Sequence, residues 1–526
     1  MNRRGLARAG LLVSGAFLVS RLLGWVRVAI IASALGVSGD GDVFATAFKL
    51  PDLMFQLVAA GALNSALIPV IAELLHRDSE DAAWRVVSTV ANLMMIALLV
   101  LATGLFVFAP LLVPLIAPGF GQTGPGFDPD RLERTVALTR IMVLSPVFLA
   151  MGSVATSVLN ARGRFAASVM APILYNIGII VGAVALYPML GISGLALGVV
   201  FGSMCHLAVQ LRPLAGVGFR YRPRISLSDP AARKALTLMA PRAFGLGAVQ
   251  VTLVVLTIQA STMAQGSIAA LTYAFTLLQI PLGVISMALG TVALPALSTA
   301  LATGETGEFV YLLRRSIRLL LFVMLPIATM GIVQAHGVVD LLFGYGRFDA
   351  DAVTVTAGTL SFFLIGLAAH AEIAILAPAF YAGQDTRTPV GIVVAGTGVS
   401  VVLAVTLAGP LGLAGLAVSV AAGAWFEGLL MVGVLGRRWP ELDLASLARA
   451  MLVALVAAVA AAGVTWLVWS NVAGLFVGPA RLSLLIRLVL ATGAGGLLYA
   501  VITRLLRVPE LDTILGVLGD LVRRRR

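Results

Sequence analysis

The chain has 526 residues, of which 60% are hydrophobic and 11% are charged, and its mean hydropathy is +1.03. Soluble domains contain about 45–50% apolar and about 25% charged residues, so these proportions exclude a soluble enzyme, a secreted disulfide scaffold and a nucleic-acid-binding domain. The net charge of +12 comes from lysines and arginines scattered between apolar runs, and the one cysteine, Cys205, lies inside such a run. We therefore expect an integral membrane protein without an intramolecular disulfide.

Apolar runs of about 20 residues, the length of a helix that crosses a bilayer, recur along the whole chain. The first is preceded by arginines, as in a signal peptide, but Arg21 and Arg27 interrupt it and no small-residue cleavage site ends it, so we interpret it as a retained helix. The pattern predicts an all-α polytopic membrane protein with fourteen transmembrane helices. Their expected limits are 11–36, 43–75, 86–116, 135–160, 165–188, 191–211, 235–263, 268–301, 316–342, 353–382, 388–408, 411–435, 446–470 and 482–505.

The placement of lysine and arginine between these runs predicts how the chain is oriented. With the N-terminus inside, the internal segments hold 26 of these residues and the external segments hold 4. Positively charged loops stay on the cytoplasmic side, so both termini are expected in the cytoplasm. No loop is long enough to form a separate folded domain, and the activity is therefore expected within the bilayer.

An internal repeat organises the predicted helices. Residues 159–169 resemble residues 380–390, and Gly191–Ala196 resembles Gly412–Ala417, both at an offset of 221. The shared offset predicts two six-helix lobes in a parallel pseudo-two-fold repeat, with two extra C-terminal helices, which is a transporter architecture. The expected parts are an N-terminal lobe at 1–212, a basic cytoplasmic linker at 213–234, a C-terminal lobe at 235–436, helices 13 and 14 at 437–508, and a basic amphipathic cytoplasmic tail at 509–526.

Cationic side chains lie inside several of the predicted helices. The first helix carries Arg21 and Arg27, with Ser14 on the same face as Arg21, the second carries Lys49, and Arg242 lies near the inner end of the seventh. A charge at the bilayer centre costs at least about 2.5–3.5 kcal/mol, so such residues tend to face a cavity or a partner. One interpretation is a cavity that binds phosphate or pyrophosphate. The other is that these side chains snorkel or make structural pairs.

Acidic side chains inside the helices are fewer. Glu427 and Glu372 are candidates for binding a coupling ion, or alternatively for neutralising an arginine of the cavity, and Asp52 could pair with Lys49 three positions before it. The chain has no recognisable metal-binding, nucleophile or nucleotide-binding motif. We therefore expect a transporter rather than an enzyme, without metal or cofactor, driven by an ion gradient, the membrane potential or substrate flux.

Several short motifs occur together between about residue 14 and residue 420. They include Ser20–Arg27, Asp42–Leu53, Gly61–Leu63, Ala117–Phe120, Ala288–Thr291, Leu294–Pro295 and Ala377–Ala382. In combination they resemble the MurJ (MviN) family, the lipid II flippases of peptidoglycan synthesis in the MOP exporter superfamily.

The resemblance implies a function and a location. Arg21 and Arg27 match cavity arginines of the family, Lys49 lies in its Phe-Lys-Leu-Pro motif, and Asp42 matches an acid near the outer gate. Lipid II would move from the inner to the outer leaflet of the bacterial cytoplasmic membrane by alternating access, with its polyprenyl tail in a groove of helices 13 and 14. The expected partners are this lipid, the membrane and the peptidoglycan synthesis machinery, and nucleic acid is not among them.

The chain lacks some charges that the family often has. It carries Val28, Phe55, Gln56, Leu256 and Thr276 at positions where family members often have charged residues. A less cationic cavity leaves alternatives open: a related polyprenyl-pyrophosphate, another polyprenyl-linked oligosaccharide, a cation-coupled antiporter of the same superfamily, or a transport-inactive membrane scaffold.

Overall fold

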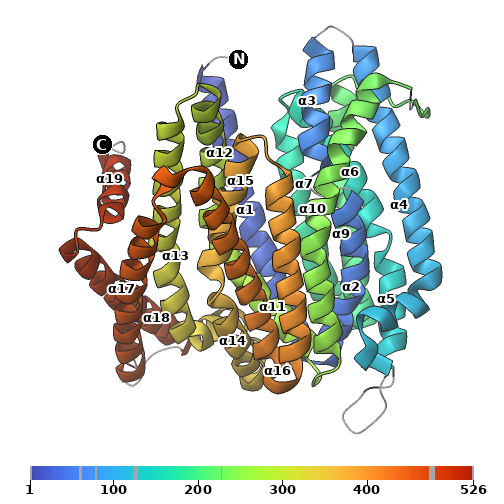
Figure 1. Cartoon of the computed structure of the whole chain (residues 1–526). Helices are drawn as coiled ribbons and strands as arrows, with labels where there is room; N and C mark the ends of the chain where they lie inside the picture. Colours follow the sequence, from blue (N-terminus) through green and yellow to red (C-terminus); the bar gives the residue numbers. More distant parts are fainter. Residues whose placement is uncertain are drawn as a thin grey trace. The chain divides into compact units, whose positions relative to one another are not determined.

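The computed structural model describes residues 3–58, 62–76, 80–121, 128, 130–226, 228–472 and 480–523. Over these ranges the chain is nearly all helical and has no β-strand (Figure 1), so the predicted all-α membrane fold is confirmed. Nine of the described helices are long and apolar enough to span a membrane, and one bent pair of helices forms a tenth candidate. The number of fourteen crossings stays a prediction.

The chain divides into two compact units, Met1–Ala269 and Ala270–Arg526. In unit 1, α7 packs against α1 and α9, α2 against α5, and α10 against α2, α3 and α4. The helices of this unit are α1 (Arg3–Leu35), α2 (Gly39–Val58), α3 (Ala62–His76), α4 (Glu80–Ile116), the 3₁₀ turn η1 (Pro118–Gly121), α5 (Arg131–Met142), α6 (Ser145–Ala161), α7 (Phe165–Val181), the π-helical η2 (Gly182–Leu186), α8 (Tyr187–Leu190), α9 (Ile192–Gly216) and α10 (Pro230–Ser261).

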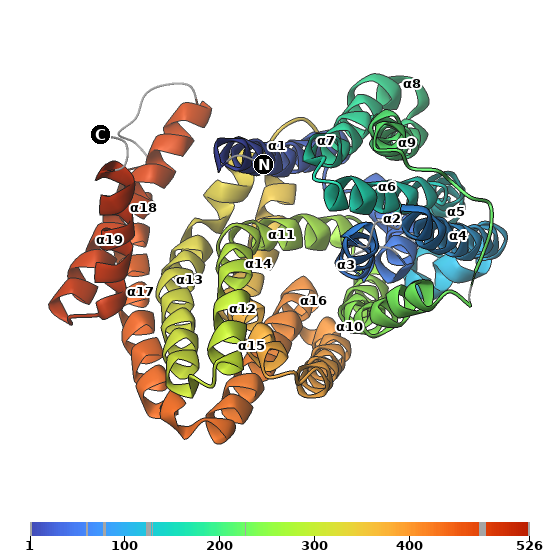
Figure 2. The same ribbon diagram turned by 90° about the horizontal axis from the view of Figure 1, so that it is seen from above.

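In unit 2, α13 is a central helix that contacts α12, α14, α15, α17 and α18. Figure 2 shows α17 and α18 beside it. The helices are α11 (Ser267–Pro281), which begins in unit 1, the π-helical η3 (Leu282–Ser286), α12 (Met287–Ala302), α13 (Thr306–Phe343), α14 (Ala350–Leu364), α15 (Leu367–Ala382), α16 (Arg387–Arg438), the 3₁₀ turn η4 (Pro440–Leu442), α17 (Leu444–Asn471), α18 (Ala480–Leu505) and α19 (Pro509–Arg523).

The boundary between the two units differs from the predicted boundary between the two lobes. The sequence places the seventh helix, which is α10, in the second lobe, whereas in the structure α10 belongs to unit 1 because it packs against α2, α3 and α4. The predicted lobe limits were drawn from the repeat, which reports on helix order rather than on the packing of one helix. They stay a prediction.

The backbone of the two units repeats at the predicted offset of 221 residues. Gly191 has φ 59° and ψ −148°, and Gly412 has φ 57° and ψ −135°, a conformation that favours glycine because it lacks a Cβ atom. The loops before α7 and α16 match as well. Gly163, before α7, has φ 67°, and Gln384, before α16 and 221 residues later, has φ 58°. The repeat is thus present in the local geometry of both units.

The close helix contacts repeat in the same way. Gly194 packs against the backbone of Leu186, and 221 residues later Gly415 packs against the backbone of Leu407. A Cβ atom on either glycine would overlap these backbone atoms. Small residues allow helices to approach this closely, and such contacts are common between membrane helices.

One predicted span is bent in the structure. The span predicted at 353–382 is divided into α14 and α15, which meet at a bend of 46°. Within the span predicted at 43–75, residues 59–61 lie outside the described part of the chain. Conversely, the spans predicted at 388–408 and 411–435 form the one hydrogen-bonded run of α16, whose break lies at Gly412. A mean hydropathy window detects apolar length, and it does not detect such backbone breaks.

The outer surfaces of the helices are apolar. One face of α4 buries Trp84 and Leu98 in the core of unit 1, while Val100, Leu111 and Leu115 are each about two-thirds exposed on the other. A helix that is apolar on all sides is typical of a membrane span, because its exposed face contacts lipid rather than water.

Candidate functional site

A cluster of polar side chains from α1, α2 and α7 lies among the apolar residues of unit 1. The guanidinium of Arg27 lies 5.9 Å from the centre of the Tyr175 ring. The carboxylate of Asp52 interacts electrostatically with Arg27 and Lys49 and accepts a hydrogen bond from the side chain of Gln56. We call these five residues the polar cluster. With two cationic groups and one carboxylate, it has a formal charge of about +1.

The sequence places the α2 members of the polar cluster on one face. Lys49 and Asp52 are three positions apart, so their side chains are neighbours on the helix surface, and Pro51 lies between them inside α2. The two side chains that the sequence offers as a pair therefore interact electrostatically. This interaction does not replace the cavity interpretation, because Asp52 interacts with Arg27 as well.

The close approach of α1 and α7 brings Arg27 to Tyr175. Asn176 donates a hydrogen bond of 3.4 Å from Nδ2 to the carbonyl oxygen of Ser20. A Cβ atom at Gly24 would lie 3.8 Å from the same Nδ2 atom, which is ordinary van der Waals contact. Tyr175 and Asn176 were not predicted from the sequence; the available signal was two adjacent polar residues in the apolar run that forms α7.

The other residues predicted for the cavity are placed as follows. Arg21 is exposed on α1, six residues before Arg27. The side chains of Ser14 and Arg242 lie outside the described part of the structure, although both residues belong to described helices, α1 and α10.

The predicted gate residue Asp42 is buried at the start of α2 and accepts bonds on both carboxylate oxygens. Its Oδ2 atom lies 2.7 Å from Nη2 of Arg131 and 2.7 Å from the backbone nitrogen of Gly266. Its Oδ1 atom accepts a bond of 2.9 Å from the backbone nitrogen of Ala269. Because Gly266 and Ala269 lie at the N-terminus of α11, Asp42 satisfies amide groups that the helix itself leaves unpaired.

Arg131 completes this arrangement from α5. Its side chain is 2% exposed, and its guanidinium lies 4.3 Å from the centre of the Phe120 ring. A buried charge is tolerated only when it is paired, so the pair with Asp42 stabilises both groups. Arg131 was not predicted from the sequence, because it lies between the expected spans 86–116 and 135–160, in an external loop where arginines are usually solvated.

Two acidic residues inside the apolar helices of unit 2 lie near one turn of α16. Glu372 on α15 is 5% exposed, and its Oε2 atom lies 3.8 Å from where a Cβ atom at Gly428 would be. Glu427, the residue before Gly428 on α16, packs its side chain against Gly396. Neither carboxylate has a hydrogen bond or ion pair within the described residues. Glu427 thus belongs to the turn of α16 that Glu372 approaches from α15.

The described residues offer no metal site of the usual kind. Among them, no group of three or more histidine, cysteine, aspartate or glutamate side chains is arranged to hold a metal ion.

The comparison with known proteins identifies the family. The family model of lipid II flippase MurJ matches residues 31–485. The chain belongs to the lipid II flippase MurJ family. Curated MurJ relatives include the lipid II flippase MurJ of Burkholderia cenocepacia, 34% identical over 432 residues, which are 81% of this chain and 83% of the relative. The probable lipid II flippase MurJ of Rhizobium meliloti is 34% identical over 472 residues, 86% of each chain.

Solved structures support the same fold. A structure of lipid II flippase MurJ in an inward closed conformation matches with a TM-score of 0.78 and 20% identity, covering 94% of this chain and 99% of that one. An inward-facing MATE multidrug transporter of the MOP superfamily matches with a TM-score of 0.64 and 15% identity, over 84% and 99%. The resemblance to the MurJ family is therefore confirmed, the fold is similar to that of a MOP-superfamily transporter, and the chain is a multi-pass membrane protein.

Proposed function

We propose that this protein is a lipid II flippase that moves the undecaprenyl-pyrophosphate-linked precursor of peptidoglycan from the inner to the outer leaflet by alternating access. The observation that carries the proposal for the site is the polar cluster, in which Arg27 and Lys49 lie together with Asp52 among apolar helices. A pyrophosphate carries several negative charges, and a guanidinium can bind it through two hydrogen bonds at once.

Asp52 has a defined role in this proposal. Two cations without a partner would be costly inside the membrane, so its carboxylate compensates part of their charge while the substrate is absent. A bound pyrophosphate supplies more negative charge than one carboxylate and competes for Arg27 and Lys49. Arg27 and Lys49 therefore have a negative partner both before and after the headgroup binds. Arg21, Ser14 and Arg242 are proposed as further contacts to the headgroup.

Asp42 is proposed as the closing contact at the outer end of the path. Its bonds to Arg131 and to the N-terminus of α11 hold α2, α5 and α11 together. For the headgroup to leave on the outer side, these bonds have to break. In the predicted orientation this end of α2 faces outward, and both termini are in the cytoplasm of a bacterial inner membrane.

The experiment that tests the function is restoration of lipid II exposure on the outer leaflet in cells depleted of their own flippase. We expect the unaltered chain to restore it and Arg27→Ala to lose at least about 90% of the activity at equal protein level, since a bidentate charged contact in a dry site contributes about 1.5–3 kcal/mol. Arg212→Ala, at an exposed arginine of α9, is the matched control. Full activity of Arg27→Ala would show that the polar cluster does not bind the substrate, and failure of the well-expressed unaltered chain would contradict the function.

A cation-coupled antiporter is a second candidate, favoured by one observation. Glu372 and Glu427 are carboxylates without partners in the described part of unit 2, and such groups can bind a coupling ion. The two candidates differ in cargo, so loss of coupling in a glutamate variant, together with unaltered lipid II exposure, would favour the antiporter.

A further inference from the structure

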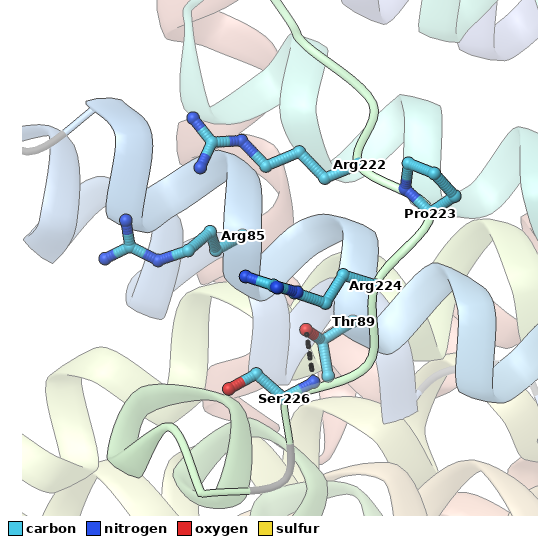
Figure 3. A pocket seen from close by; sticks show the side chains of 6 residues that line it. All are labelled: Arg85, Thr89, Arg222, Pro223, Arg224 and Ser226. Carbon is cyan, nitrogen blue, oxygen red and sulfur yellow. Dashed lines mark hydrogen bonds between the residues drawn. The ribbon is translucent and has the colours of Figure 1, made fainter.

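A basic pocket of about 280 Å³ lies in unit 1, away from the polar cluster. It is formed where the first turns of α4 meet the extended segment that follows α9 (Figure 3). Its lining consists of Arg85, Thr89, Arg222, Pro223, Arg224 and Ser226. None of these residues belongs to the polar cluster or contacts Asp42, so the proposed transport site leaves the pocket unexplained.

Hydrogen bonds fix the extended segment on α4. The Nδ2 atom of Asn92 donates to the carbonyl oxygens of Arg222 and Arg224, at 3.1 Å each. The backbone nitrogen of Ser226 donates to Oγ1 of Thr89 at 3.4 Å, the bond that Figure 3 draws. Since the bonds to Asn92 hold the backbone of both arginines, their side chains start from fixed positions beside Arg85.

The pocket has more positive than negative charge. Arg222 pairs with Asp81 at 2.6 Å, whereas Arg85 and Arg224 are exposed and have no ion pair within the described residues. Figure 3 shows the guanidinium groups of all three arginines extended toward the same side of the pocket. Three guanidinium groups against one carboxylate favour an anion with several acceptor oxygens, and a phosphate group meets this requirement.

The surface of α4 beyond the pocket indicates which phosphate compound would bind. Ile96 is eleven residues after Arg85 on α4, a rotation of about 20° around the helix axis. Ile96, Leu99 and Val100 are 50%, 46% and 65% exposed. An exposed apolar stripe therefore begins about three turns beyond Arg85, after Thr89 and Asn92, and runs along α4 into the region where acyl chains lie. The pocket volume is near the lower limit of about 300 Å³ for ligand sites, which suits a headgroup rather than a whole lipid.

We propose that this pocket binds the phosphate group of an anionic phospholipid, with the acyl chains along the exposed stripe of α4. The predicted orientation puts the pocket at the cytoplasmic surface, where anionic lipids attract basic residues. A bound lipid bridges α4 and the extended segment through Arg85 and Arg224. The site requires no transport activity, so it is independent of the proposed function.

The test measures lipid binding to the purified full chain in neutral detergent. Short-chain phosphatidylglycerol, short-chain phosphatidylcholine and inorganic phosphate are titrated separately by calorimetry. We expect phosphatidylglycerol to bind at least about tenfold more tightly than the other two. The double variant Arg85→Gln/Arg224→Gln should weaken it about 30-fold, roughly fivefold for each arginine. The control Arg212→Gln/Arg437→Gln removes the same charge from two other exposed positions and should bind as the unaltered chain does.

Each other outcome contradicts the proposal in a distinct way. Equal binding of phosphatidylcholine would show that headgroup charge is not recognised. Equal binding of inorganic phosphate would make the site one for a soluble phosphate compound. Unchanged binding in Arg85→Gln/Arg224→Gln, or an equal loss in the control, would place the lipid elsewhere. All four substitutions are at exposed side chains, and equal unfolding temperatures of the variants would confirm that they fold.

Discussion

Arg27, Lys49 and Asp52 show what can be read from single residues in an apolar chain. A charged side chain in a membrane helix is costly, so its presence marks a candidate position that faces a cavity or a partner. The sequence therefore predicted Arg27 and Lys49. It did not predict Tyr175, because placing an aromatic residue in a membrane helix carries no energetic penalty that would indicate a site. The contact of Arg27 with the Tyr175 ring depends on how α1 packs against α7.

Glu372 and Glu427 permit a prediction at this scale. If they bind the coupling ion, Glu372→Gln and Glu427→Gln should reduce gradient-driven transport about tenfold, to the rate without a gradient, because the neutral amide no longer attracts a cation. The measurement is transport in proteoliposomes with and without imposed proton and sodium gradients.

The matched control for these variants is Glu308→Gln. Glu308 is an exposed acid at the start of α13 in the same unit, and its loss should leave the gradient dependence unaltered. A gradient response equal to that of the unaltered chain in both Glu372→Gln and Glu427→Gln would assign these residues to packing.

At the scale of elements, helix ends decide contacts that apolar patterns do not report. The N-terminus of α11 presents free amide groups, and Asp42, more than 220 positions earlier in the chain, accepts bonds from two of them. Such a cap between elements has no local signature in the sequence. Only the matching motif of the family pointed to Asp42, and nothing pointed to Arg131.

Substitution of Asp42 tests this arrangement. Asp42→Asn should destabilise the protein by about 3–5 kcal/mol, because it leaves the guanidinium of Arg131 buried without its anion. Asp40→Asn, which removes a pair with Arg134 that is about one third exposed, should cost at most about 1 kcal/mol. Thermal unfolding of the purified variants measures both effects. An added Arg131→Met should recover part of the loss in Asp42→Asn; equal unfolding temperatures for Asp42→Asn and Asp40→Asn would contradict the buried pair.

For the whole molecule, the distribution of lysine and arginine predicts an orientation in the membrane. After replacement of Cys205 by alanine, a new cysteine at Glu305, between α12 and α13, should be protected from an impermeant thiol reagent in intact cells. A new cysteine at Asp351, at the start of α14, should react. Both positions are exposed, so labelling after permeabilisation is the control. The reverse labelling pattern would overturn the predicted cytoplasmic termini.

The sequence by itself determined the class of the protein, the apolar helices, the internal repeat and the family. Composition decides whether lipid or water is the solvent, and local periodicity decides the helix, so both are properties of the chain alone. The repeat persists in the structure, because Gly191 and Gly412 adopt the same unusual backbone conformation.

Tertiary structure decided what long-range packing controls. It bent one span between α14 and α15, it assigned α10 to unit 1, and it paired Asp42 with Arg131. It also assembled the pocket at Arg85 from segments more than 130 residues apart. These features depend on which helix surfaces pack together, and in an apolar chain many surfaces are alike. One arrangement is distinguished from another by the polar atoms and helix ends that are hydrogen-bonded in it.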